Sequence, residues 1–441
     1  MSLRIIAQLL PLVLSSTTFA ADSIYEMRYE PSDKPGELAF AVTYRLWVPD
    51  GLDQVRGVIV HQHGCGWPAS RGGQTAVNDL HWQALARKWG CALFGSCYDQ
   101  KDGDNCRLWC DPRNGSRARF LQALDDFALL SKHAELSRAP WCLWGHSGGG
   151  FWASLMQCSD PDRIVAIWLR SGTAFEAWEK GEVPKPELPE AVFAVPVVCN
   201  VGVKEKDDER FKKAWTGAEA MFRAYRAKGA PIAFVPDPQT GHECGDSRYL
   251  AIPYFDACLS LRLAGPGVAD GALKPIPRRQ GWLAEFGGDR AVPVASFAGK
   301  FEESLWLPTE GVARAWSEYV TKGIVGDTTP PPAPFALKAE RKNDYTIDLS
   351  WDAHADLESG LSGFVIQRDG KAIARVPGKA PTQFTRPLFQ KLSYHDTPER
   401  PLPAMTYRDS IVPEGVKPRY QVVAINGVGM ESPPSAPSSA R

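Results

Sequence analysis

A glycine-rich turn in the first half of the chain constrains the fold most strongly. Residues 141–150 read WCLWGHSGGG, and an apolar stretch follows them. This pattern predicts a short buried strand that turns sharply at Ser147 into a helix. Gly145 and Gly149 leave room for strand and helix to cross closely around a strained residue. The turn therefore favours Ser147 as an exposed nucleophile over a glycine-rich turn that merely contains a serine.

A second loop of small residues precedes this turn. The apolar run GVIV, typical of a strand buried on both faces, leads into HQHGCGW at residues 61–67. Backbone N–H groups reach a substrate oxygen only where the neighbouring side chains are small. We therefore expect Gly148 N–H and Cys65 N–H to be oxyanion donors, with Gly64 N–H as the alternative to Cys65. Trp67 ends the loop and is a candidate substrate-binding residue.

An acid and a base follow the serine in the chain. An apolar run ends at Gly202, and VKEKDD comes next. The acid of a catalytic triad usually lies about three residues beyond such a glycine, which selects Glu205. Asp207 and Asp208 remain alternatives, because the stretch also reads as a solvated run of charges. His242 is the one histidine between this stretch and the C-terminal part, and we expect it to be the general base.

A polar loop over residues 98–114 should lie above the carboxyl edge of the sheet, where ligands bind. Its Trp109 has two open interpretations, a substrate contact and a buried anchor of the loop. Of the ten cysteines, Cys106 and Cys110 flank part of this loop and are the expected participants in a disulfide. The sequence has no C-x-x-C motif and no compact Cys/His cluster, so it predicts no metal site.

The N-terminal segment has the pattern of a secretory signal. A charged start, an apolar stretch and small residues near Ala20 predict a signal peptide over residues 1–20 and a secreted or periplasmic protein. The apolar stretch is too short to span a membrane, and the sequence predicts no other transmembrane segment. The formal net charge is −1 without a basic run, so we expect no nucleic acid partner.

A proline-rich stretch divides the chain into two parts. Residues 21–327 predict a catalytic domain, of which residues 264–327 form a packed extension. The extension contains a predicted helix from about residue 310 to 321, with Thr309 as its N-cap and Gly323 at its end.

Residues 328–334, TTPPPAP, predict a stiff linker. Short alternating strands over residues 335–441, with a hairpin signal at Asp369-Gly370, predict an all-β sandwich. We expect this domain to be a spacer, or to bind carbohydrate or a cell surface, rather than to belong to the active site. A purely structural appendage is the alternative.

Several of these motifs together resemble a known superfamily. The HGC loop at residues 63–65, Asp99-Gln100 with nearby Cys106 and Trp109, and the GHSGG turn are similar to α/β-hydrolase esterases over residues 40–262. Within that superfamily they look like secreted polyhydroxyalkanoate depolymerases and the related feruloyl and acetylxylan esterases. Residues 334–441 resemble a fibronectin type III domain, with Trp351 as the core tryptophan and Tyr420 near the tyrosine-corner strand.

The resemblance implies an α/β-hydrolase fold with a C-terminal fibronectin type III-like sandwich. It also implies a serine esterase that cleaves small or polymeric carboxylic esters, of plant polysaccharides or polyesters, without a cofactor. Two alternatives remain open: a serine peptidase of the same fold, and a non-catalytic surface-binding protein.

Overall fold

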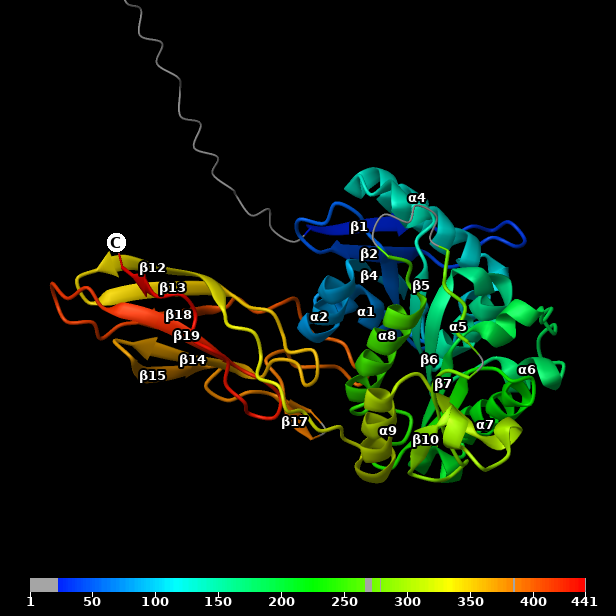
Figure 1. Cartoon of the computed structure of the whole chain (residues 1–441). Helices are drawn as coiled ribbons and strands as arrows, with labels where there is room; N and C mark the ends of the chain where they lie inside the picture. Colours follow the sequence, from blue (N-terminus) through cyan, green and yellow to red (C-terminus); the bar gives the residue numbers. More distant parts are fainter. Residues whose placement is uncertain (1–22, 266–271, 278, 384, 441) are drawn as a thin grey trace, which may run out of the picture.

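The computed structural model describes residues 23–265, 272–277, 279–383 and 385–440. The predicted signal peptide lies outside these residues. The chain forms a mixed α/β body, called here the catalytic body, and a smaller all-β part, called here the sandwich (Figure 1). Within the described residues, no helix is long and apolar enough to cross a membrane.

An eight-stranded sheet forms the centre of the catalytic body, in the order β1-β2-β4-β3-β5-β6-β7-β8. The first two strands are antiparallel to their neighbours, and the other six are parallel. Strands β3 to β7 are buried along their whole length, as their apolar runs predict. The strands are β1 (Ser23–Tyr29), β2 (Val42–Val48), β3 (Gly57–Gln62), β4 (Cys91–Tyr98), β5 (Trp141–His146), β6 (Ile164–Arg170), β7 (Val197–Gly202) and β8 (Ile232–Asp237).

Helices cover both faces of this sheet, and α2 and α8 lie on the side that faces the sandwich (Figure 1). This mostly parallel sheet between helices is consistent with an α/β-hydrolase-like fold. The helices are α1 (Trp67–Ala76), α2 (Leu80–Trp89), α3 (Arg107–Cys110), α4 (Ser116–Ser131), α5 (Gly148–Ser159), α6 (Phe175–Glu179), α7 (Lys212–Arg226) and α8 (Arg248–Arg262).

The segment before the linker packs on the catalytic body. It contributes a three-stranded sheet, β9 (Trp282–Ala284), β10 (Ala291–Pro293) and β11 (Leu305–Leu307), and helix α9 (Glu310–Lys322). The predicted helix ends are present: the Thr309 side chain accepts from Val312 N at 3.3 Å, and Gly323 ends α9 at φ 72°. Trp306 and Trp316 are buried in the main core.

The sandwich consists of two antiparallel sheets, compatible with the predicted β-sandwich. Trp351 packs edge-on against Phe364 of the facing sheet at 5.2 Å between ring centroids. Asp369 and Gly370 both have positive φ, as the predicted hairpin turn requires. One sheet contains β12 (Phe335–Asn343), β13 (Thr346–Asp352) and β18 (Thr406–Asp409). The other contains β14 (Gly363–Arg368), β15 (Lys371–Val376), β19 (Arg419–Ile425) and β20 (Ser438–Ser439), and a separate small hairpin contains β16 (Thr382–Gln383) and β17 (Arg386–Pro387).

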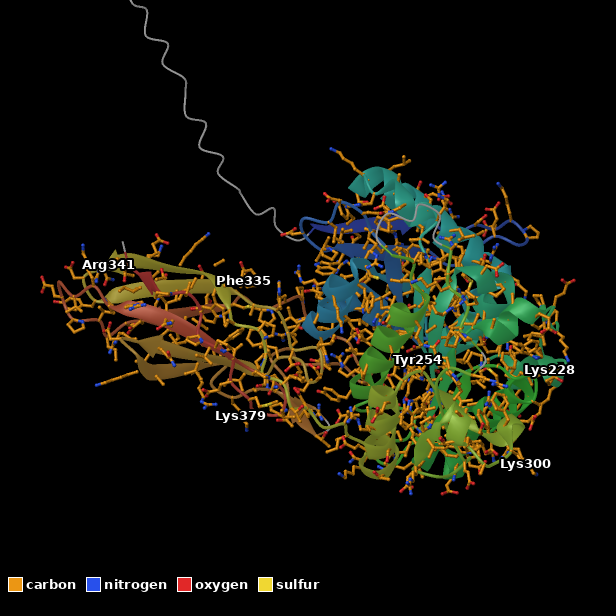
Figure 2. The ribbon with its side chains drawn as sticks, viewed as in Figure 1. Lys228, Tyr254, Lys300, Phe335, Arg341 and Lys379 are labelled. Atoms are coloured by element: carbon orange, nitrogen blue, oxygen red, sulfur yellow. A yellow bond between two sulfur atoms is a disulfide. The ribbon has the colours of Figure 1, made fainter. Side chains whose placement is uncertain are left out.

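The proline-rich linker predicts a spacer, but the structure instead docks one end of the sandwich against the catalytic body. Arg248 of α8 forms buried ion pairs with Asp79, at 2.7 Å, and with Asp396 of the sandwich, at 2.8 Å. Gln390 donates to Asn78 O at 2.6 Å and accepts from Leu80 N at 3.0 Å. The opposite end, around Arg341, points away from the catalytic body, whose far surface carries Lys228 and Lys300 (Figure 2).

Candidate active site

Ser147 lies at the turn between β5 and α5 with φ 54° and ψ −118°. Such a backbone conformation is strained for a residue with a side chain, and close packing holds it in place. A Cβ at Gly149 would lie 1.8 Å from Gln62 O, and one at Gly145 would lie 2.5 Å from Gly149 O. The two glycines therefore let strand and helix cross, as the sequence pattern predicts.

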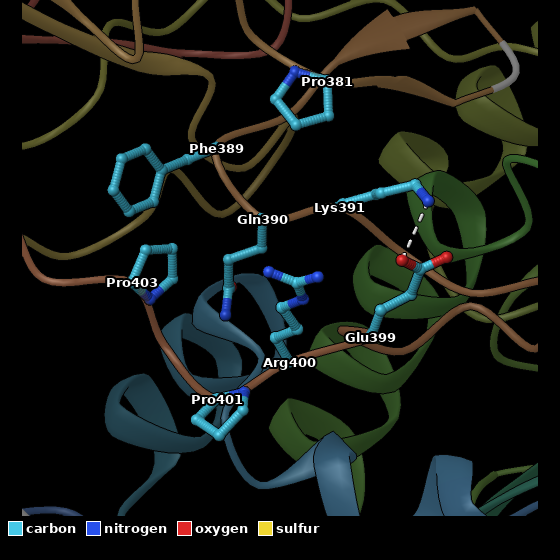
Figure 3. Close-up of a pocket in the computed structure, with 8 residues that line it drawn as sticks. All are labelled: Pro381, Phe389, Gln390, Lys391, Glu399, Arg400, Pro401 and Pro403. Carbon is cyan, nitrogen blue, oxygen red and sulfur yellow. Dashed lines mark ion pairs between the residues drawn. The ribbon is translucent and has the colours of Figure 1, made fainter.

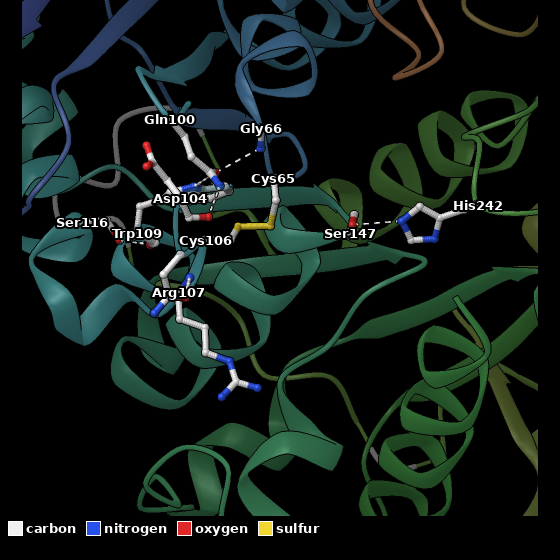
Figure 4. The surroundings of a disulfide bond; sticks show 11 residues. Cys65, Gly66, Gln100, Asp104, Cys106, Arg107, Trp109, Ser116, Ser147 and His242 are labelled. Atoms are coloured by element: carbon white, nitrogen blue, oxygen red, sulfur yellow. Dashed lines mark hydrogen bonds between the residues drawn. A yellow bond between two sulfur atoms is a disulfide. The ribbon is translucent and has the colours of Figure 1, made fainter. Parts of the chain in front are cut away.

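Ser147, His242 and Glu205 form one hydrogen-bonded line. His242 Nε2 lies 2.9 Å from Ser147 Oγ, and His242 Nδ1 lies 2.6 Å from Glu205 Oε1 (Figure 4 shows the first of these contacts). Because a carboxylate only accepts, His242 donates from Nδ1 and accepts at Nε2 from the serine hydroxyl. Glu205 is fully buried and accepts from Gly202 N at 3.2 Å, whereas Asp207 and Asp208 are exposed. The structure thus brings Glu205, the first-ranked acid, to the histidine.

Two side chains, Arg170 and Phe211, fix the loop that carries His242. The guanidinium of Arg170, fully buried at the end of β6, donates to Gly241 O at 3.0 Å, to Thr240 Oγ1 at 2.8 Å and to Glu243 O. Phe211 stacks on the His242 ring, with centroids 3.7 Å apart and planes 8° apart. These contacts fix both the main chain and the ring plane of the histidine.

The candidate oxyanion donors lie beside the serine. A Cβ at Gly64 would lie 3.2 Å from Ser147 Cβ, and one at Gly148 would lie 3.3 Å from Cys65 N. The backbones of Cys65 and Gly148 are thus adjacent, with Gly148 at the N-terminal end of α5, where N–H groups favour negative charge.

A disulfide and a glutamine hold the oxyanion loop. Cys65 pairs with Cys106, and the 98–114 loop is thereby tied to the loop after β3 (Figure 4). The expectation for Cys106 is met, but the one for Cys110 is wrong, because its thiol is free and buried. Gln100 Oε1 accepts from Gly66 N at 3.0 Å and from Trp109 Nε1 at 2.7 Å, so it joins the two loops a second time.

The two tryptophans named from the sequence occupy different environments. Trp109 has no exposed surface and stacks on Tyr98, with ring centroids 4.5 Å apart. Of its two interpretations, the buried loop anchor fits this position and the substrate contact does not. Trp67 is 46% exposed at the start of α1, with the Arg71 guanidinium 4.8 Å from its ring centroid. It remains available to a ligand.

The sandwich reaches this site through residues 391–399. His395 Nδ1 lies 3.3 Å from Nδ1 of His146, the residue before the serine, and His146 Nε2 lies 2.7 Å from His242 O. Burial lowers the pKa of His146 well below its usual value and lowers that of His395 to about 4, with His242 as a lesser cause for both. Both rings are therefore neutral near pH 7.

A separate hollow lies on the sandwich side of the molecule. It is lined by Pro381, Phe389 and Gln390, and an ion pair of 2.9 Å joins Lys391 to Glu399 at its side (Figure 3). All its lining residues belong to the sandwich, so it is distinct from the site that contains Ser147.

The sequence motifs do not indicate several residues that support the site. Arg170 and Phe211 stand in ordinary strand and helix-start sequences, and only the fold brings them to the triad. Gln100 belongs to the Asp99-Gln100 pair included in the resemblance, but its bonds to Gly66 and Trp109 cannot be read from the sequence. His395 is 153 positions beyond His242, in the part expected to be a spacer. The position of His146 directly before the nucleophile is only a weak sign of a role in the site, because the residues that His146 contacts cannot be read from the sequence.

Comparison with known proteins gives only distant likenesses. No family model and no curated protein matches the chain. An S-formylglutathione hydrolase from Agrobacterium tumefaciens is similar over 54% of this chain and 94% of its own, at 14% identity and a TM-score of 0.36. An Fn3-like protein from Clostridium thermocellum is similar over 26% of this chain and 94% of its own, at 21% identity and a TM-score of 0.17.

Proposed function

We propose that this protein is a serine hydrolase that cleaves carboxylic esters through Ser147, His242 and Glu205. The single observation that carries the proposal is the continuous line from the buried Glu205 carboxylate through His242 to the Ser147 hydroxyl, at 2.6 and 2.9 Å. A nucleophile within reach of a base, with that base oriented by a buried acid, is the arrangement that acyl transfer needs.

In the first half of the reaction, Ser147 Oγ attacks the carbonyl carbon of the ester while His242 Nε2 takes the hydroxyl proton. The carbonyl oxygen becomes an oxyanion, and the N–H groups of Cys65 and Gly148 donate to it. Glu205 stabilises the positive charge on His242. When the C–O bond to the leaving group breaks, His242 gives its proton to the departing alcohol and an acyl-enzyme remains.

In the second half, a water molecule attacks the acyl carbon and His242 Nε2 takes its proton. The second oxyanion uses the same two donors, and His242 then returns the proton to Ser147 Oγ as the acid is released. Every proton moves through one nitrogen of this chain, so the reaction needs no cofactor.

The finer parts of the proposal concern substrate and location. We propose an exported enzyme that acts on esters of plant polysaccharides or on polyesters. The N-terminal pattern of residues 1–20, the Cys65–Cys106 disulfide and the half-exposed Trp67 near the site support this. The far end of the sandwich, away from the catalytic body, remains available to bind carbohydrate or a cell surface.

A panel of aryl, acetyl, feruloyl and hydroxyalkanoate esters, with peptide amides beside them, tests the function. We expect turnover of esters, and Ser147→Ala should lower it by about 10⁴-fold or more while the protein stays folded. Faster cleavage of peptide amides would favour the peptidase. A folded Ser147→Ala protein with unchanged ester turnover, or a wild-type protein without turnover of either class, would contradict the proposal.

A further inference from the structure

Two imidazoles, those of His395 and His146, connect the sandwich to the main chain of the catalytic histidine. His146 Nε2 lies 2.7 Å from the carbonyl oxygen of His242, which can only accept. His146 therefore carries its proton on Nε2, and its Nδ1 is an acceptor as long as the ring is neutral. Nδ1 of His395, at 3.3 Å, is then the donor. The two hydrogen bonds therefore run in one direction: His395 of the sandwich donates to His146, and His146 donates to the main-chain carbonyl of His242.

His395 is fixed in the sandwich by its neighbours on both sides. Asp396 is buried in the ion pair with Arg248, and Arg248 Nη2 also donates to Asp396 O at 2.8 Å. The turn closes on itself through Ser393 N, which donates to Thr397 O at 2.7 Å. The imidazole of His395 thus belongs to a rigid turn that α8 anchors, not to a freely moving loop.

The contact from His146 complements the one from Arg170. Arg170 holds the carbonyls of Gly241 and Glu243, on either side of the histidine, and His146 holds the carbonyl of His242 itself. His146 also directly precedes the serine. Rotation of its ring would therefore disturb the nucleophile and the base together. A donor to His146 Nδ1 is what keeps the ring in the tautomer that supports His242.

We propose that His395, supplied by the sandwich, is a positioning residue of the active site that acts through His146 on the His242 main chain. This inference rests on the proposed function for its kinetic consequences. It gives the sandwich a part in the catalytic site itself, which the linker pattern does not predict. His395 makes no contact with the serine or the carboxylate in this scheme.

The full-length protein with three substitutions tests this. His395→Leu removes the donor, whereas His395→Asn keeps an N–H close to the position of Nδ1. Gln390→Leu is the matched control, because it removes two contacts between the sandwich and the catalytic body at Asn78 and Leu80 without touching His146. The measurements are kcat and KM on an aryl ester, the rate of Ser147 labelling by a fluorophosphonate, and the melting temperature.

We expect His395→Leu to lower kcat and the labelling rate by about 10-fold or more, because misplacement of a catalytic group by 1 Å costs up to about 100-fold. KM should stay within about twofold, and His395→Asn should recover most of the rate. Equal losses in His395→Asn and His395→Leu, or an equal loss of kcat in Gln390→Leu at the same melting temperature, would overturn the proposal.

A spectroscopic readout separates this inference from the esterase function. In ¹⁵N-histidine-labelled protein, His146 should show the neutral Nε2–H tautomer, and His395→Leu should broaden or shift that signal. An unchanged His146 signal in the variant would refute the positioning role even if the protein proved to hydrolyse no ester. Absence of both turnover and Ser147 labelling in the wild type would instead refute the proposed function.

Discussion

The buried cluster of Arg248, Asp79 and Asp396 offers a direct test of how firmly the sandwich is joined to the catalytic body. Side-chain exposures are 3%, 1% and 1%, and the shortest distances of the two ion pairs are 2.7 Å to Asp79 and 2.8 Å to Asp396. Arg248→Met keeps most of the side-chain volume but leaves two carboxyl groups without their cation. Removal of one partner from a buried ion pair costs about 3–5 kcal/mol, because the remaining charge is neither solvated nor paired.

The two carboxyl groups would not respond equally. Burial raises the pKa of Asp396 to about 7 even though Arg248 opposes this, so Asp396 can take up a proton at modest cost when the arginine is absent. Asp79 caps α2 by accepting from His81 N at 3.0 Å and from Trp82 N at 3.3 Å, and it would remain charged longer. We therefore expect a loss of about 4 kcal/mol in the free energy of unfolding, mostly through Asp79.

Urea unfolding at pH 7.5, followed by tryptophan fluorescence, measures this loss. Arg408→Met is the control, because its two bonds to Asp348 have similar distances, 2.7 and 2.8 Å, on the surface. An exposed pair contributes about 0–1 kcal/mol. Adding Asp79→Asn and Asp396→Asn to Arg248→Met should recover part of the loss, since asparagine also caps helices. A loss below about 1 kcal/mol, equal to that of the control, would refute the reasoning.

Two further predictions concern the triad acid and the dependence of stability on pH. Glu205→Gln should lower kcat on an aryl ester by about 10²-fold or more, whereas Asp207→Asn should change it less than about twofold, and the reverse order would move the acid to Asp207. Acidification from pH 6.5 to pH 5 should destabilise the fold by about 2–3 kcal/mol per pH unit, because near pH 5 the unfolded chain binds about two more protons than the folded one. Histidines with a lowered pKa contribute their full stabilisation above pH 6.5 and lose it as the pH falls, whereas aspartates with a raised pKa have the opposite effect on stability between about pH 7 and pH 4. Urea titrations at both pH values measure the net change in the free energy of unfolding. A free energy of unfolding that rises on acidification would contradict the prediction. In the described residues, the histidines whose pKa is lowered are His61, His63, His81, His146 and His395, and the aspartates whose pKa is raised are Asp246, Asp356 and Asp396.

The sequence predicts those parts of the molecule that depend on local chemistry. The turn at Ser147 needs glycines at fixed offsets, and α9 begins and ends at residues suited to cap it. The parallel strands are continuous apolar runs because both of their faces are covered. The order of serine, acid and histidine along the chain then places the three side chains at one edge of the sheet.

Residues whose partners lie far away in the chain could not be found in this way. Cys106 and Cys110 look alike in the sequence, and only the approach of the loop after β3 selects Cys106 as the partner of Cys65. Phe211 precedes α7 as an unremarkable residue, and its stacking on His242 depends on where the loop after β7 ends. Spacing motifs carry no information about such contacts.

The docking of the sandwich shows the same limit at the level of domains. A proline-rich linker is stiff, but its stiffness only fixes the direction in which the chain leaves the catalytic body. It does not require the two parts of the molecule to stay apart. Side chains of both parts hold the sandwich against the catalytic body. One of them is Leu80 of α2, which is buried in the hydrophobic cluster of the sandwich. Arg248 on α8 has one carboxylate partner in the catalytic body, Asp79, and a second one, Asp396, which reaches it from 148 residues away. A buried arginine on a helix that covers the sheet, paired with a carboxylate of the sandwich, is therefore the physical sign that another part of the chain completes this surface, and with it the support of His146 and His242.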